Sequence, residues 1–135
     1  MKLEDAVQVA SHGMRVQSTR VQIASQNLAN SDSLATTPGG DPYQRRTVSF
    51  REALDRESGL ELVEIDRYGV DESGFDQRYD PSHPAAADNG YVKLPNVEPL
   101  VELMDMREAQ RSYEANLQAM SMTRSMVSQT LNLLK

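Results

Sequence analysis

Side chains able to do catalytic or metal chemistry are scarce in this chain, which has two His and no Cys among its 135 residues. Without a thiol, the sequence offers no disulfide, thiolate metal ligand or cysteine nucleophile. His12 and His83 each lack a second ligand at the spacing that a metal site on a helix or loop requires, so we expect both to be structural or solvated. The central acidic residues could pair for general acid–base catalysis, but their spacing singles out no pair.

One acidic stretch, Asp71–Asp76, superficially resembles a cation-binding loop. It lacks the ligand order of a calcium loop and the glutamate that closes such a loop, which predicts a solvated turn. The sequence also has no Gly-rich phosphate loop, and no Ser lies in the strand–turn–helix setting of a nucleophile elbow. We therefore expect no catalytic, cofactor-binding or metal-binding residues. A small hydrolase using central carboxylates is the weakest hypothesis.

Composition and charge exclude several other classes of protein. The net charge of −6 makes the chain a poor partner for nucleic acid, and no apolar run is long enough to span a membrane. The first six residues carry acid where a secretory signal peptide is basic, so we expect no cleaved signal. Leu, Ile, Val and Phe are few for a chain of this charge, which predicts a thin core that neighbouring subunits complete.

Turn-forming residues divide the chain into three parts. All six Pro and six of the seven Gly lie between residues 38 and 99, so the ends favour helices and the middle favours turns and short strands. We expect an N-terminal helix in 1–32, a turn-rich small β module in 33–96 and a C-terminal helix in 97–135, the two helices forming one core domain. The best strand candidates are 47–50 and 60–65, and the weaker ones are 74–79 and 91–94.

Each terminal segment has an apolar stripe in which steps of three and four residues alternate. Such stripes predict two long helices that pair as an antiparallel, coiled-coil-like hairpin, in a mainly α fold with an irregular β module between the helices. The residues expected at this intrachain seam are Leu3, Val7, Ala10, Met14, Val21, Leu28, Tyr113, Leu117, Met120, Val127 and Leu131.

The C-terminal segment has a second apolar stripe on nearly the opposite face of the predicted helix. A single partner helix cannot bury opposite faces, and adaptable Met side chains among few charges suit a protein interface. We predict that this stripe contacts neighbouring subunits; packing against the central module is the alternative. The predicted assembly interface consists of Ala115, Ala119, Met122, Met126 and Leu133.

Several blocks of the sequence resemble a known family, in the family's order and along the whole chain. Ser25–Ser33 resembles the motif that ends the N-terminal helix of bacterial flagellar axial proteins. Blocks farther along resemble the proximal rod members of this family in particular. These blocks are Gly40–Arg46, Tyr79–Ala86, Gly90–Val97 and Arg111–Asn116.

The resemblance implies a structural subunit of the flagellar basal-body rod, without catalytic site or cofactor, that assembles helically and transmits motor torque across the periplasm. It implies export by the flagellar type III apparatus without a cleaved signal, with the helices inside the rod and the central module outside. The implied neighbours are further copies of the chain, the rod proteins FlgB, FlgF and FlgG, and the adaptor FliE. Composition alone leaves a cytosolic helical-hairpin adaptor or secretion chaperone as the main alternative.

Overall fold

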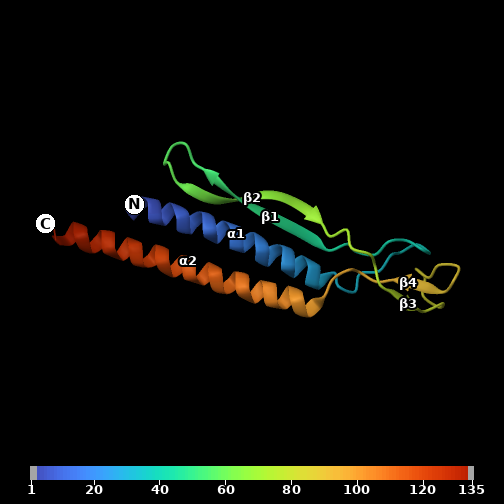
Figure 1. Ribbon diagram of the computed structural model, residues 1–135. Helices are drawn as coiled ribbons and strands as arrows, with labels where there is room; N and C mark the ends of the chain where they lie inside the picture. Colours follow the sequence, from blue (N-terminus) through green and yellow to red (C-terminus); the bar gives the residue numbers. More distant parts are fainter. Residues whose placement is uncertain (1–2, 134–135) are drawn as a thin grey trace.

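The computed structural model describes residues 3–133, which form two long helices and two small antiparallel sheets (Figure 1). The sequence prediction of a helical hairpin with a small β module between its helices is confirmed. The elements, in chain order, are α1 (Leu3–Ala29), β1 (Arg46–Leu54), β2 (Glu61–Val70), β3 (Gln77–Tyr79), β4 (Tyr91–Lys93) and α2 (Pro99–Leu133).

The two helices lie side by side and run antiparallel, so α1 begins at the end of the molecule where α2 finishes (Figure 1). Asn27, near the end of α1, hydrogen-bonds to Glu102, near the start of α2. Toward the middle of the helix pair, Gly13 of α1 lies against Asn116 of α2. In both pairs the residue numbers have the same sum, which is the register of an unbroken antiparallel pair. Because α2 has 35 residues and α1 has 27, α2 is about 12 Å longer.

The helices approach each other closely because small residues occupy several positions between them. Ala10, Ala24 and Ala109 are buried. A Cβ added at Gly13 would lie 2.7 Å from Nδ2 of Asn116, so that side chain would have to shift, and glycine is what lets the Asn116 amide lie directly against α1. The helix pair therefore depends on close packing of small residues more than on large apolar side chains.

Polar residues mark the helix ends. Beyond α1, the Nδ2 of Asn30 donates to the carbonyl oxygen of Gln26, and the Oγ of Ser31 donates to that of Leu28. The same two carbonyls also accept the backbone N–H groups of Asn30 and Ser31, so side chain and backbone together close the end of α1. Pro99 opens α2, where a fixed φ suits the first turn and no N–H is needed.

Strands β1 and β2 form a hairpin that packs on α1, on the side away from α2 (Figure 1). Their register shifts between Ser49 and Phe50, which marks a β-bulge in β1. Leu62 of β2 is buried. The long part of the molecule thus has three layers in the order hairpin, α1 and α2, and both strands extend beyond the ranges expected from sequence.

Strands β3 and β4 form a separate two-stranded sheet beyond the ends of both helices (Figure 1). Val92 and Ala85 are buried there, while the rings of Tyr79 and Tyr91 pack edge to face with their centroids 5.3 Å apart. The central module is therefore two distinct sheets at different places along the helix pair, because β1–β2 lies on α1 and β3–β4 does not.

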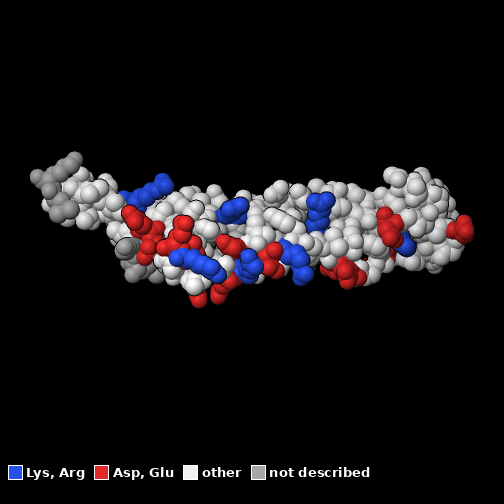
Figure 2. Space-filling view, turned by 90° about the horizontal axis from the view of Figure 1, so that it is seen from above, with Lys and Arg blue, Asp and Glu red and all other residues white. Residues whose placement is uncertain are grey.

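The last turns of α2 extend past the described part of α1. The register set by Asn27–Glu102 and Gly13–Asn116 places Leu3 opposite Met126, so later residues of α2 have no counterpart in α1 (Figure 1). From residue 115 to the end of the chain, the only charged side chains are those of Arg124 and Lys135. The charges seen from above are concentrated away from this projecting end, whose described surface is largely white in Figure 2.

Candidate functional site

A network of polar side chains, which we call the polar junction, joins the two helices to the loops at the end near β3 and β4. It combines residues from α1, α2, the start of β1 and three connecting segments. Its members are Asn27, Tyr43, Arg45, Arg46, Asp71, Asn96 and Glu102.

Asn27 is fully buried and uses both ends of its amide. Its Oδ1 accepts a hydrogen bond from the Oη of Tyr43 and another from the backbone N–H of Arg46, each at 2.8 Å. Its Nδ2 donates to the carbonyl oxygen of Arg46 at 2.9 Å and to Oε2 of Glu102 at 3.3 Å. One amide side chain therefore holds the start of β1 and the start of α2 against the end of α1.

Glu102 is 2% exposed, and its main ionic partner is Arg45. The Nε of Arg45 donates to Oε1 of Glu102 in a short, charge-assisted hydrogen bond. The same guanidinium lies 3.8 Å from a carboxylate oxygen of Asp71 and 3.8 Å from one of Asp105. Because an unpaired buried carboxylate is strongly destabilising, the ion pair with Arg45 is what allows Glu102 to be buried between the elements.

Asn96 extends the junction to the segment that follows β2. Its Oδ1 accepts the backbone N–H of Arg45 at 2.7 Å, and its Nδ2 donates to the carbonyl oxygen of Asp71 at 2.9 Å. Hydrogen bonds from the backbone and side chain of Ser73 lower the pKa of Asp71, and the charge of Arg45 lowers it further. The stretch expected to be a solvated turn is thus partly a structural anchor, because Asp71 belongs to the junction.

The phenol of Tyr43 is the hydroxyl donor of the polar junction. Burial raises its pKa, with a smaller contribution in the same direction from the charge of Glu102, while Arg46 opposes the shift. The hydroxyl is therefore protonated at neutral pH and available to donate to Asn27.

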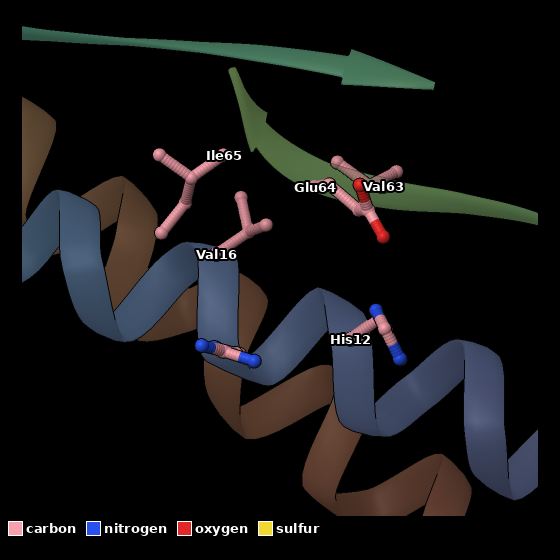
Figure 3. Close-up of a pocket in the computed structure, with 6 residues that line it drawn as sticks. His12, Val16, Val63, Glu64 and Ile65 are labelled. Atoms are coloured by element: carbon pink, nitrogen blue, oxygen red, sulfur yellow. The ribbon is translucent and has the colours of Figure 1, made fainter. Parts of the chain in front are cut away.

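Neither histidine is a member of the polar junction. His12 lines a hollow of about 260 Å³ between α1 and β2, where its imidazole and the carboxylate of Glu64 point toward one another, beside Val16 and Ile65 (Figure 3). His83 accepts the backbone N–H of Ala85 at Nδ1, at 3.0 Å, within a loop. Across residues 3–133, no group of three or more His, Asp or Glu side chains is placed to hold a metal ion.

The predicted assembly stripe of α2 lies on the surface of the subunit. Met122 is 62% exposed, Met126 is 49% exposed and Leu133 is 87% exposed, and Ala115 and Ala119 are exposed as well. The β1–β2 hairpin, which was the other candidate cover, contacts α1 and not α2. The stripe is thus available to a neighbouring molecule, and its assignment to such a contact stays a prediction.

The residues predicted at the helix seam differ in burial. Ala10 is buried; Val7, Met14, Val21, Leu28, Tyr113 and Met120 are half-buried; and Leu3, Leu117, Val127 and Leu131 are exposed. Val21 and Tyr113 line one hollow between the helices, which places them side by side. The buried residues of α2 are Glu102, Ala109 and Thr123. Together with the half-buried Asn116, they form a row in which successive residues are seven positions apart.

The sequence patterns did not single out Asn27, Arg45 or Glu102 as site residues, because none of the three belongs to an apolar stripe or to a catalytic or metal-binding motif. The available signal was indirect. Asn27 lies in the block 25–33, Arg45 in the block 40–46 and Asn96 in the block 90–97, which are three of the blocks that carry the family resemblance. In the structure these blocks meet at the polar junction.

Comparison with known proteins supports the same family. The family model described as flagellar basal body rod FlgEFG protein C-terminal matches residues 88–133. A flagellar basal-body rod protein FlgC from Agrobacterium fabrum is 52% identical over 133 residues, which cover 98% of this chain and 96% of the relative. The chain belongs to the FlgC family of flagellar basal-body rod proteins. FlgC proteins from Aquifex aeolicus and Salmonella typhimurium are 37% and 36% identical, with at least 96% of each chain covered.

Membership of the FlgC family makes this chain a structural component of the flagellar basal-body rod, which assembles with other rod components. The relatives give no support to the alternative of a cytosolic adaptor or secretion chaperone. In the part of the chain that the structure describes, no helix is long and apolar enough to cross a membrane. The polar junction and the exposed faces of α2 are therefore structural features of a rod subunit.

Proposed function

We propose that this FlgC-family chain is a subunit of the proximal rod that assembles helically with its neighbours and transmits motor torque across the periplasm. The paired helices form the axial core unit, built from 1–32 and 97–135, and the module in 33–96 lies outward or laterally. A heterologous contact that does not close on itself generates such a helical assembly from identical or related subunits.

The observation that carries this proposal is the surface of α2. Its second half exposes apolar residues on several sides, carries very little charge and projects past α1. Monomeric proteins rarely leave such a surface to water, and charge depletion is typical of interface cores. Neighbouring subunits in a rod would cover it and complete the core.

The neighbours we propose are further copies of this chain, the rod proteins FlgB, FlgF and FlgG, and the adaptor FliE. We also propose that the chain reaches the rod through the flagellar type III export apparatus, without a cleaved signal peptide. We assign it no catalytic activity and no cofactor, because its relatives are flagellar rod proteins and its buried polar side chains Asn27, Glu102 and Thr123 are all hydrogen-bonded within the fold.

The substitution Met122→Asp tests the assembly interface. Burying a carboxylate without a partner costs several kcal/mol, which is enough to prevent the contact. We expect export of the variant to continue, but rod growth to stop and motility to be lost. The measurements are swimming assays, rod length in basal-body preparations and immunoblots of exported protein.

The matched control is Gln110→Asp, which adds the same charge to an exposed polar position in the first half of the same helix, outside the projecting end. We expect it to leave rods complete. Full motility and complete rods with Met122→Asp would show that this stripe faces solvent in the rod, and would remove α2's second stripe from the proposed interface.

A further inference from the structure

Three parts of the chain must meet before the side chains of Asn27 and Glu102 have all their partners in the polar junction. Glu102 belongs to α2 and Asn27 to α1, but the Arg45 guanidinium and three of the four hydrogen bonds of Asn27 come from the segment 43–46. The same segment leads directly into β1. The base of the helix pair and the hairpin are therefore joined through a shared set of bonds.

If the helices paired without the segment 43–46, the buried polar groups where α1 ends and α2 begins would lose most of their partners. Asn27 would keep only its bond to Glu102, and the buried Glu102 carboxylate would have an amide as its remaining partner. Breaking a buried ion pair by removing one member is strongly destabilising, because the remaining charge has lost its hydration. An apolar seam at this position would instead allow the helices to pair with or without the module.

We propose that the polar junction is a latch that makes helix pairing conditional on docking of the segment 43–46. The helix bases and the β1–β2 hairpin then form and separate as one cooperative unit within a single chain. A subunit that lacks an ordered hairpin cannot present a closed helix pair for assembly. This inference concerns the isolated chain, so it stands or falls independently of which neighbours the rod contains.

Arg45→Met tests the latch, because it keeps an unbranched side chain and removes the charge. Hydrogen exchange is measured in the full-length chain over 20–29 and 99–109, which are the helix bases, and over 47–54 in the hairpin. In the native chain we expect all three segments to be protected to a similar degree. In Arg45→Met we expect their protection to fall together by about a hundredfold or more.

A second variant separates the ion pair from general damage. Adding Glu102→Gln to Arg45→Met removes the uncompensated charge and keeps the shape of the side chain. We expect the double variant to recover at least about tenfold of the lost protection in all three segments, because the two sites are coupled. The control is Arg107→Met on the exposed surface of α2, where Arg107 has no ion pair with any described residue.

Several outcomes would overturn the latch. One is a native chain in which the hairpin is protected but the helix bases are not, because the latch requires the three segments to be protected together. A native chain in which all three segments lack protection would also overturn it, because the latch acts within a single chain. Another is an Arg45→Met variant that loses protection only in the hairpin. A third is a double variant no better protected than Arg45→Met.

Discussion

At the scale of the residue, the subunit depends on which atoms donate and which accept at the polar junction. Asn27 satisfies two donors and two acceptors at once, and a carboxylate or a hydroxyl at this position could not do the same. Glu102 is tolerated inside the molecule because Arg45 reaches it. The charge and the hydrogen-bonding pattern of these side chains, more than their size, hold the helices to the module.

Tyr43→Phe should weaken the fold modestly and change its response to high pH. The variant loses the bond from Tyr43 to Asn27 and leaves an acceptor short of a donor, which costs about 1 kcal/mol at neutral pH. Burial raises the pKa of Tyr43, so its contribution is fully present below the unfolded pKa of about 10 and is lost as the pH rises through the folded value. Urea unfolding of both chains at neutral pH and from about pH 9 to pH 11 measures the effect.

We expect the stability of the native chain to fall more steeply over the alkaline range than that of Tyr43→Phe. Equal steepness in the two chains would mean that the Tyr43 hydroxyl contributes nothing through ionisation. The other four tyrosines are present in both chains, so their titration cancels in the comparison.

At the scale of the element, the helix pair is set by close approach and register more than by a broad apolar face. Gly13 lies directly against Asn116. Three of the four residues in the row of α2 with a spacing of seven are polar, namely Glu102, Asn116 and Thr123. A polar residue at such a position can specify the register of paired helices at some cost in stability. None of the five residues predicted for the seam of α2 belongs to this buried row, although Tyr113 and Met120 are half-buried.

Gly13→Leu should therefore separate the helices near their middle. Even the first added carbon would lie 2.7 Å from Asn116 Nδ2, and a larger side chain cannot be accommodated by moving that amide alone. We expect a loss of about 2 kcal/mol in the free energy of unfolding, although leucine favours helix more than glycine does. Chemical denaturation monitored by far-UV circular dichroism measures this change.

The matched control is Ser11→Leu, which adds the same side chain to an exposed position of α1. We expect Ser11→Leu to change the stability by less than about 0.5 kcal/mol. Similar losses in both variants would argue against a close helix approach at Gly13.

At the scale of the whole molecule, one end of the subunit is held by buried contacts, and the other end, which we call the open end, has almost none. The polar junction holds the end near β3 and β4, whereas among the described residues none before Ala10 and none after Thr123 is buried. The projecting end of α2 consists mainly of apolar and neutral polar side chains. Because this end buries so little within its own chain, we expect contacts with neighbours in the rod to order it.

Hydrogen exchange of the isolated chain should show this difference between the two ends of the molecule. We expect amides in 124–133 and 3–9 to exchange quickly, close to the rate of an unstructured peptide, and those in 99–109 to exchange much more slowly. The measurement requires a sample verified as monomeric, with the same segments followed in purified rods as the reference state, where they should be protected. Slow exchange of 124–133 in a verified monomer would contradict the open end.

The sequence by itself determined the two helices, the turn-rich module between them, the antiparallel pairing and the family. Periodicity and the positions of Pro and Gly suffice for these, because they reflect local conformational preference and apolar patterning. The blocks that identified the family were visible as strings of residues, but their structural purpose was not. Nothing in the spacing of Asn27, Arg45 and Asn96 predicts that their side chains meet.

Only the tertiary structure decided where the module lies and which residues hold it. The hairpin covers α1 and leaves α2 bare, and Glu102 is buried although carboxylates are usually on the surface. Both facts depend on contacts between segments far apart in the chain. A buried charge is acceptable only when a specific partner arrives from elsewhere, and a local pattern cannot contain that information.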